Sequence, residues 1–545
     1  MNLFNIECIL VVFSESVLYK IKFMVNKTLW QKTKTTLLWI LKILAVILCT
    51  MLVFVGAGLA TVPEYIQTTY GTISFEQILF TLAQSGEQTA AGTAEAARSI
   101  ATTLLSSAVV LAFVVLAGLI ICMFRLREKR LNRAIIISLC GSVIFCALGF
   151  MNAANSVDFF GYLKRQQYSS EDFYEYNYVD AQDVEFDFPE KKRNLVYIIL
   201  ESMEETFKDT AHGGAMEQNL IPNLTEIQNE NLTFTQNSGL TNSFSTGCTV
   251  YSLVAQTSGT PLIFRPLSEA TVMLPGTVTI TDILADNGYE QTFLIGSNEG
   301  FDSRGEYFRS HGDVAVKDYY YALEEEWIPE GYDVWWGYED DKLFDFAKEE
   351  LTRLSESGDP FAFYTLTTDT HFPDGYICPD CPDKFDKQYF NAIYCSDKKA
   401  AEFIRWIQKQ PWYENTTIVV TGDHPTMNSD LFGDISRSGY ERSVFHTIIN
   451  PGNERAVIRD IQATPFDLFP TTLSSLGVKM SSNQLGFGVD LFSGETTLAE
   501  RYGASQFSNL IFSKSPYYEH KLWKDQRPNK DSNGNYVEEA SEDEA

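Results

Sequence analysis

The sequence predicts a chain in which transmembrane helices near the N-terminus precede a large outer α/β domain. Three long apolar runs lie within residues 1–155, and short strands then alternate with helical stretches through most of the remaining chain. Charge separates the same two regions. Residues 1–155 contain 12 basic and 7 acidic side chains, whereas the rest of the 545 residues contain 30 and 64. The acidic balance disfavours a general nucleic-acid binder, which needs a basic surface.

Each apolar run is long enough, or nearly so, to cross a hydrocarbon layer about 30 Å thick as a helix. The runs span residues 37–60, 104–124 and 134–151, and their only charged side chain is Lys42. The third run is the shortest, and a buried core helix is the alternative interpretation for it. We therefore expect a membrane domain over residues 1–155 with three transmembrane helices.

Basic residues indicate how these helices are oriented. They cluster before the first run, from Lys20 to Lys34, and in the short segment between the second and third runs. Positive charge marks the cytoplasmic side of a membrane. We expect a multi-pass protein of the cell membrane with a cytoplasmic N-terminus and an extracellular region after Met151. Either Met1 or Met24 could be the true start, and no cleavable signal is expected.

The remaining chain divides into three parts. Residues 156–190 are expected to form a connector, residues 191–505 an α/β domain, and residues 506–545 an extension that ends in an acidic, disordered tail. Alternating strands and helices predict an open, mostly parallel sheet with helices on both faces. The clearest strands are Asn194–Leu200, Glu290–Ile295, Phe361–Leu366 and Thr416–Val420, and amphipathic segments such as 341–354 and 397–410 lie between them.

Polar side chains typical of metal or phosphate sites follow all four strands. Glu201 follows the first, Asp423 and His424 follow the fourth, His371 lies shortly after the third, and Arg304 lies beyond the second. Ligands bind beyond the carboxyl ends of strands in open α/β sheets. Two carboxylates and one imidazole suit Mn²⁺, Zn²⁺ or Mg²⁺. Taken alone, Glu201 could instead cap a helix, and the Asp-His pair could be a structural hydrogen-bonded pair.

A candidate nucleophile lies in the segment TNSFSTGCTVYSLVAQTSGTP, residues 241–261. The hydroxyl of Thr249 is expected at a helix start, where backbone N–H groups and the helix dipole favour a phosphate. A simple N-cap role is the alternative. Coordination to a divalent cation would lower the pKa of this hydroxyl, and the cation would also neutralise charge on phosphoryl oxygens.

These motifs resemble those of the lipoteichoic acid synthase and phosphoglycerol transferase family, within the sulfatase-like alkaline phosphatase superfamily. NLVYIILES, TGCTVYSLVAQTSGTP and TGDH resemble its metal and nucleophile motifs, and DTHFPDGY resembles its substrate-side histidine motif. The resemblance implies transmembrane helices followed by an extracellular α/β sulfatase-like catalytic domain. It implies Thr249 as the catalytic nucleophile, Glu201, Thr249, Asp423 and His424 as metal ligands, and His371 and Arg304 as substrate-binding residues.

The activity implied by the resemblance is transfer of glycerol phosphate from phosphatidylglycerol to a cell-envelope polymer or glycan, through a phospho-threonine-type covalent intermediate. One divalent ion would be required, with Mn²⁺ preferred over Mg²⁺ or Zn²⁺. The implied partners are the membrane, the lipid donor and a glycan or teichoic-acid-type acceptor, with no nucleic acid. A phosphoethanolamine transferase of the same superfamily and a non-catalytic envelope scaffold protein are the alternatives. Sulfate-ester hydrolysis is not expected, because the Cys-x-Pro-x-Arg motif is absent at Cys248.

Three further cysteines lie close together in the sequence of the outer region. Cys378 and Cys381 are separated by two residues, and Cys395 follows fourteen residues later. This spacing allows a disulfide, free thiols or a zinc site. Outside the membrane we favour a disulfide, with Cys381–Cys395 slightly ahead of pairs that use Cys378.

Overall fold

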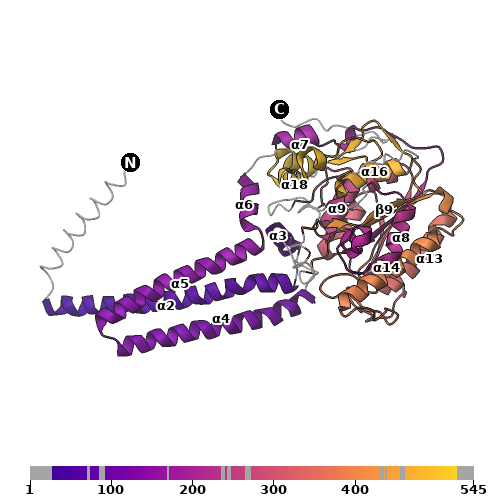
Figure 1. Ribbon diagram of the computed structural model, residues 1–545. Helices are drawn as coiled ribbons and strands as arrows, with labels where there is room; N and C mark the ends of the chain where they lie inside the picture. Colours follow the sequence, from indigo (N-terminus) through magenta and orange to yellow (C-terminus); the bar gives the residue numbers. More distant parts are fainter. Residues whose placement is uncertain are drawn as a thin grey trace. The chain divides into compact units, whose positions relative to one another are not determined.

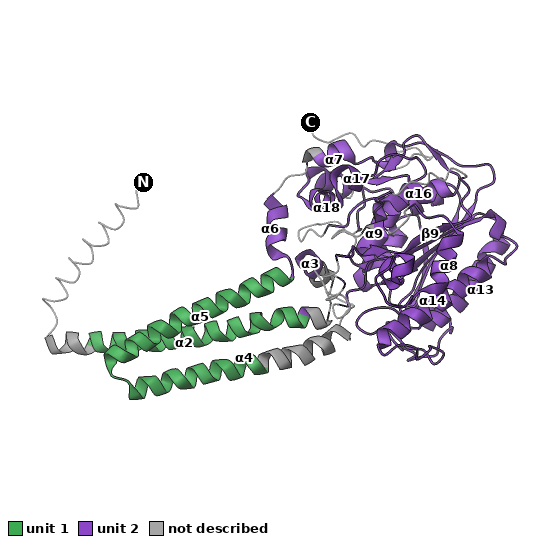
Figure 2. Ribbon diagram, viewed as in Figure 1, with its two compact units in different colours: residues 1–65, 94–156 green, residues 66–93, 157–545 purple. Residues whose placement is uncertain are grey.

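The computed structural model forms two compact units (Figure 2). The first comprises residues 1–65 and 94–156, and the second comprises residues 66–93 and 157–545. The expected chain start and the expected acidic tail lie outside the described residues. The structure describes residues 27–69, 74–84, 92–167, 171–234, 240–241, 247–263, 272–428, 435, 439–453 and 461–523.

The first unit contains three long helices that are apolar enough to cross a membrane, as predicted. They are α2 (Lys27–Thr69), α4 (Gly92–Arg125) and α5 (Glu128–Ser156), and each is longer than the apolar run that predicted it. Large apolar side chains are exposed along all three, including Phe113, which is 67% exposed. Water would not stabilise such surfaces, whereas lipid would.

The three helices pack against one another through small and apolar residues (Figure 1). Val46 and Cys49 of α2, Leu119 of α4 and Ile135 of α5 belong to one buried cluster. At Gly149 of α5, an added Cβ would lie 2.5 Å from the carbonyl oxygen of Gly56 in α2. Glycine therefore permits a backbone approach that no other residue would allow, as is common where transmembrane helices pack.

The second unit is built on a six-stranded sheet in the order β5-β4-β6-β2-β7-β9. All neighbouring strands are parallel except β9, which pairs antiparallel with β7. Four strands confirm the prediction, and β7 extends two residues further than expected. The bounds are β2 Asn194–Leu200, β4 Glu290–Ile295, β5 Ala315–Lys317, β6 Phe361–Leu366, β7 Thr416–Gly422 and β9 His446–Ile449.

Helices cover both faces of this sheet, as the strand–helix alternation predicted (Figure 1). Successive side chains of β2 point to opposite faces: Tyr197 enters one apolar core and Ile198 the other. The first core includes residues from α9 (Thr249–Ser258), α10 (Ile280–Asp286) and α16 (Leu468–Ser475). The second includes residues from α8 (Pro222–Glu230), α13 (Asp340–Ser357) and α14 (Gln388–Ile407).

The second unit extends beyond the boundaries expected at residues 190 and 505. Aromatic side chains from both flanking segments are buried in its first core, and the Tyr174 hydroxyl donates a hydrogen bond to the Ile511 carbonyl at 2.6 Å. The expected connector and the start of the expected C-terminal extension thus pack as one part of the fold. These segments form α6 (Phe159–Gln167), α7 (Glu171–Asn177), β1 (Phe186–Asp187), α18 (Ala504–Phe512) and a π-helical turn, Tyr518–Leu522.

The remaining elements are short and lie around the sheet. The helices are α3 (Phe75–Gln84), α11 (Arg304–Ser310), α12 (Tyr319–Glu324) and α17 (Leu498–Tyr502). The strands form three antiparallel pairs: β1 with β10 (Lys479–Met480), β3 (Leu240–Thr241) with β8 (Ser443–Val444), and β11 (Gln484–Leu485) with β12 (Gly488–Val489).

Candidate metal centre and nucleophile

The register of two neighbouring strands brings two acidic residues together. Leu200 at the end of β2 pairs with Gly422 at the end of β7, so Glu201 and Asp423 leave the sheet side by side. A Cβ at Gly422 would lie 2.0 Å from the carbonyl oxygen of Met203. Glycine is therefore required for β7 to approach the chain that follows β2.

Glu201, Asp423 and His424 form a compact group of possible metal ligands. One ligand atom from each lies within 4.8 Å of the others, and all three side chains are buried. The Thr249 hydroxyl oxygen joins this group. It lies 2.9 Å from Asp423 Oδ2, 3.4 Å from Glu201 Oε2 and 3.5 Å from His424 Nε2. Two carboxylates, an imidazole and a hydroxyl fit one divalent cation such as Mn²⁺ or Zn²⁺.

Thr249 is held in this group by the helix that it begins. Ser252, one turn further along α9, donates a hydrogen bond to the backbone carbonyl of Asp423 at 2.6 Å. Gln256 follows one turn later and donates to the carbonyl of Gly422 at 3.2 Å. The same face of α9 thus contacts the end of β7 at successive turns.

Hydrogen bonds from the surrounding chain orient the candidate ligands. Asp423 Oδ1 accepts from the backbone N–H groups of Ser202 and His424, at 2.7 and 2.8 Å, so Oδ2 is left facing Thr249. The Ser202 hydroxyl donates to Glu201 Oε1 at 2.6 Å. His424 Nδ1 lies 3.0 Å from the Pro425 carbonyl, which makes Nδ1 the donor and leaves Nε2 as the ligand atom. Such outer contacts set the orientation and basicity of metal ligands.

The electrostatics of the group favour a bound cation. Burial, and then the neighbouring Glu201, raise the pKa of Asp423 to about 7. Burial alone would lower the pKa of His424, but the negative Asp423 and Glu201 outweigh it and the pKa is raised. In the absence of a cation, both groups therefore hold protons more tightly than usual. A divalent ion would supply the same positive charge and displace those protons.

The two predicted substrate-side residues lie near this centre, and the charge of Asp423 acts on both. His371 Nδ1 lies 2.8 Å from the Phe372 carbonyl, so Nδ1 donates and Nε2 is the acceptor. Burial lowers the pKa of His371 to about 4, which keeps the ring neutral. Arg304 is buried, and its Nη2 donates to Ser297 Oγ at 2.7 Å. Arg304 Nε has no hydrogen-bond partner among the described residues.

Two residues beside the centre were not predicted as site residues. The ring of Trp336 lies 4.5 Å from the ring of His371, and Trp336 remains 39% exposed. Asp302 lies close enough to Arg304 for their charges to interact, and burial raises the pKa of Asp302 to about 6. The two adjacent tryptophans, Trp335 and Trp336, in an otherwise polar loop were the sequence feature that could have indicated a site position for Trp336. No sequence feature indicated Asp302, because only tertiary packing brings it to the site.

A buried charge network supports the loop that carries His371. Lys399 of α14 lies 3.0 Å from Asp369 and 2.8 Å from Asp341. Asp340, at the start of α13, accepts hydrogen bonds from the backbone N–H groups of Thr368 and Asp369 at 2.8 and 3.2 Å. These contacts fix the turn after β6 against two helices of the second core.

Comparisons with known proteins identify relatives over this unit. Residues 193–478 match the family model described as Sulfatase. Phosphoglycerol transferase I of Escherichia coli O6:K15:H31 is 33% identical over 321 residues, which cover 56% of this chain and 40% of that protein. The enzyme of the same name from Salmonella newport matches equally well. The chain thus spans about 40% of the length of the curated relatives that it matches.

Two solved structures are similar to parts of this chain. The lipoteichoic acid synthase LtaP from Listeria monocytogenes is 18% identical with a TM-score of 0.43, over 57% of this chain and 79% of that one. The phosphoethanolamine transferase EptA from Neisseria meningitidis is 16% identical with a TM-score of 0.46, over 82% and 87%. The family resemblance predicted from the motifs is confirmed by the family model and the curated relatives. Because the family model covers more than half of the 545 residues, this chain belongs to the sulfatase family.

Proposed function

We propose that this protein is a metal-dependent phosphotransferase that moves glycerol phosphate from phosphatidylglycerol to a cell-envelope polymer or glycan. One observation carries the proposal: the Thr249 hydroxyl lies against the Glu201, Asp423 and His424 side chains at the carboxyl ends of β2 and β7. A nucleophile that touches all three candidate ligands suits phosphoryl transfer. The similarity to phosphoglycerol transferases supports glycerol phosphate as the transferred group.

Glu201, Asp423, His424 and the Thr249 hydroxyl would hold one divalent ion, for which we propose Mn²⁺, with Mg²⁺ and Zn²⁺ as alternatives. When bound, the ion would lower the pKa of the Thr249 hydroxyl and neutralise charge on the phosphoryl oxygens. The oxygen-rich donor set suits Mn²⁺, while the imidazole also admits Zn²⁺.

The first half-reaction forms a bond from Thr249 Oγ1 to the donor phosphorus and breaks the bond from phosphorus to the diacylglycerol oxygen. The Thr249 hydroxyl, 2.9 Å from Asp423 Oδ2, releases its proton in this step, and the diacylglycerol oxygen takes that proton up. The diacylglycerol oxygen leaves with a proton as a free hydroxyl. The glycerol phosphate remains on Thr249 as a phosphodiester, so one ester is exchanged for another.

In the second half-reaction, an acceptor hydroxyl attacks the same phosphorus and Thr249 regains its proton. His371 is neutral and presents Nε2 as an acceptor, so it is suited to bind the acceptor hydroxyl or take its proton. The guanidinium of Arg304 is suited to bind a phosphoryl oxygen through Nε. Trp336, beside His371, offers an apolar wall to the bound group.

We further propose that the three apolar helices anchor the protein in the cell membrane, with a cytoplasmic N-terminus and an extracellular catalytic domain. The basic residues from Arg125 to Arg133, at the end of α4 and the start of α5, support this orientation. Membrane anchoring would keep the enzyme in the same layer as an insoluble lipid donor. Residues 191–505 would contain the chemistry, supported by the segments on either side that pack into the same core.

The experiment is a search for the covalent intermediate. The full-length protein is placed in vesicles with labelled phosphatidylglycerol or labelled phosphatidylethanolamine and Mn²⁺, and then digested for mass spectrometry. We expect a glycerol phosphate adduct on Thr249 with phosphatidylglycerol only, and none in Thr249→Ala. An adduct from phosphatidylethanolamine alone would replace the donor with that of a phosphoethanolamine transferase. A Thr249→Ala protein that complements a deletion as well as wild type would instead indicate a non-catalytic scaffold.

A further inference from the structure

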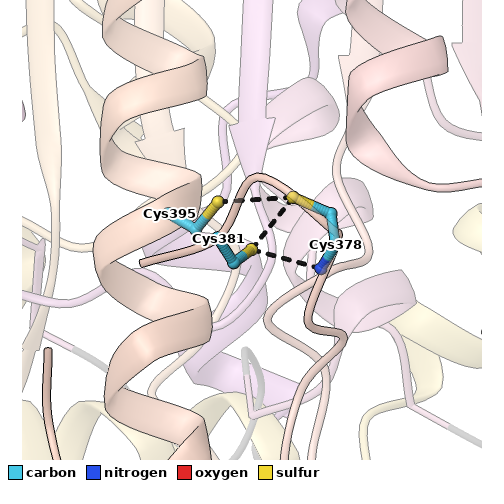
Figure 3. Close-up of side chains that lie close together, drawn as sticks. All are labelled: Cys378, Cys381 and Cys395. Carbon is cyan, nitrogen blue, oxygen red and sulfur yellow. Dashed lines mark hydrogen bonds between the residues drawn. The ribbon is translucent and has the colours of Figure 1, made fainter. Parts of the chain in front are cut away.

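A group of three thiols lies in the second unit, outside the proposed active site (Figure 3). Cys378 and Cys381 belong to the loop after β6, and Cys395 lies in α14. Cys378 Sγ lies 3.1 Å from Cys381 Sγ and 3.7 Å from Cys395 Sγ. All three sulfur atoms fall within 4.8 Å of one another, and each cysteine is free.

The spacing of the sulfur atoms fits a shared metal ion. Thiolates bind Zn²⁺ at about 2.3 Å, so tetrahedral geometry separates two of them by about 3.8 Å. The separation of 3.7 Å between Cys378 and Cys395 agrees with that value, whereas the separation of 3.1 Å between Cys378 and Cys381 is shorter and would widen when both sulfurs bind one ion. A disulfide would join two of the three sulfurs and leave the third without a role. Cys378 and Cys395 are only 2% and 4% exposed, so the group is largely shielded from water.

The thiolate is the form of cysteine that binds metals, and a bound ion would supply the positive charge that this form needs. The positive charge of Lys399, one helical turn after Cys395 in α14, acts on all three thiols, but burial and the hydrogen bonds among the thiols leave the pKa of Cys378 and Cys395 raised and only that of Cys381 lowered, to about 6. The backbone N–H of Cys378 also donates to Cys381 Sγ at 3.2 Å. This N–H donor offsets part of the negative charge that the Cys381 thiolate would carry.

We propose that Cys378, Cys381 and Cys395 form a second metal site, which binds a thiophilic divalent ion such as Zn²⁺. Within the described residues, no fourth His, Cys, Asp or Glu atom belongs to this group. The fourth coordination position is left to a water molecule or another small ligand. This site differs in chemistry from the Glu201, Asp423 and His424 group, which contains no sulfur.

Such an ion would fasten the loop after β6 to α14. Backbone hydrogen bonds fold this loop between His371 and the cysteines: the His371 carbonyl accepts from the Gly375 N–H at 3.2 Å, and the Asp369 carbonyl accepts from the Tyr376 N–H at 2.7 Å, two residues before Cys378. Gln388, at the start of α14, also donates to the Gly375 carbonyl at 3.1 Å. The ion would therefore reduce the mobility of the segment that contains His371.

The test is a titration with Co²⁺, which reports sulfur ligands by a thiolate-to-metal charge-transfer band. The full-length protein is purified in detergent without oxygen, stripped of metal, titrated with Co²⁺ and then with Zn²⁺. We expect the band to form, to be removed by Zn²⁺, and to be lost in Cys378→Ser, Cys381→Ser and Cys395→Ser. Cys140→Ser, in a membrane helix, and Glu201→Gln should both retain it. The Glu201→Gln result separates this site from the proposed active site.

Hydrogen exchange provides a second readout that does not depend on activity. Zn²⁺ should slow exchange of the backbone amides between His371 and Lys387 in the wild-type protein and not in Cys395→Ser. The proposal is overturned if Co²⁺ gives no charge-transfer band with the reduced protein, or if the band survives all three cysteine substitutions. It is also overturned if protein taken directly from the membrane contains a disulfide between two of these cysteines.

Discussion

The hydroxyl oxygen of Thr249 lies 2.9 Å from Oδ2 of Asp423, although the two residues are 174 positions apart in the sequence. The contact follows from two local features. The end of β7 lies beside the end of β2, and Ser252 and Gln256 of α9 donate hydrogen bonds to backbone carbonyls at the end of β7. A hydroxyl that touches this buried carboxylate has a place in the proposed metal centre.

Ser202→Ala should weaken Mn²⁺ binding about tenfold, the lower end of the range for residues that orient metal ligands. The Ser202 hydroxyl donates to Glu201 Oε1 at 2.6 Å, and its loss leaves that carboxylate free to rotate. Isothermal titration calorimetry on the full-length protein measures the change. Ser355→Ala, at a partly exposed position of α13 far along the chain from the proposed ligands, is the matched control and should not alter affinity. Equal affinities for the two variants would contradict the assigned orientation.

The affinity for Mn²⁺ should fall as the pH decreases through about 7. The metal-free protein holds a proton on Asp423, whose pKa is raised to about 7, and the pKa of His424 is raised as well. Mn²⁺ must displace these protons in order to bind. At a pH below the pKa of a ligand group, each further pH unit therefore weakens binding about tenfold for every proton that is displaced. Calorimetry between about pH 6 and pH 8 checks the slope. An affinity that does not change over this range would show that neither group is a ligand.

Arg442→Met should destabilise the second unit by about 3 to 5 kcal/mol, because it leaves a buried carboxylate unpaired. Glu204 is fully buried and accepts hydrogen bonds from Arg442 Nε at 2.8 Å and Nη2 at 2.6 Å. The exposed pair of Arg405 and Glu230 provides the control. Arg405→Met should lower the free energy of unfolding by less than about 1 kcal/mol. Thermal unfolding in detergent compares the two variants, and similar melting temperatures would contradict the prediction.

Gly149→Val should disrupt packing within the membrane unit, whereas Gly118→Val should not. An added Cβ at Gly149 would lie 2.5 Å from the backbone oxygen of Gly56, but at Gly118 it would meet no atom within 4 Å. Because the conflict is with backbone, no side chain can move to relieve it. We expect a lower unfolding temperature in detergent for Gly149→Val alone. An equal shift for both variants would mean that the close approach of α2 and α5 does not contribute to stability.

Much of the fold could be predicted from local sequence patterns. β2, β4 and β6 have the predicted bounds, because each is a short apolar run between polar or glycine-containing segments. The edge strands β5 and β9 contain three and four residues, too few for a recognisable pattern. Helix α14 begins at Gln388 instead of at the expected residue 397, since its first turns pack on the sheet and lack a polar face.

The candidate site was predictable to a smaller extent. Glu201, Asp423 and His424 could be identified because polar residues directly follow buried strands, and the strand register then brings them together. That register, and the order β6-β2-β7, depend on tertiary packing and could not be deduced from chain order. The same limit explains why the position of Trp336 beside His371 was not predicted. The disulfide that we favoured, with Cys381–Cys395 slightly ahead, is not formed in the structure, which brings all three sulfurs together as free thiols.

The short strands at the two borders of the main sheet have a further consequence. The edge strands β5 and β9 contain three and four residues, so they leave few unpaired backbone N–H and C=O groups at the edges of the sheet. Long, flat borders can recruit strands from other chains and start aggregation. In this sheet the two edge strands have only three and four residues, so they offer little template for pairing with another chain. Short edge strands therefore favour a unit that does not associate with its neighbours when many copies are crowded on a surface.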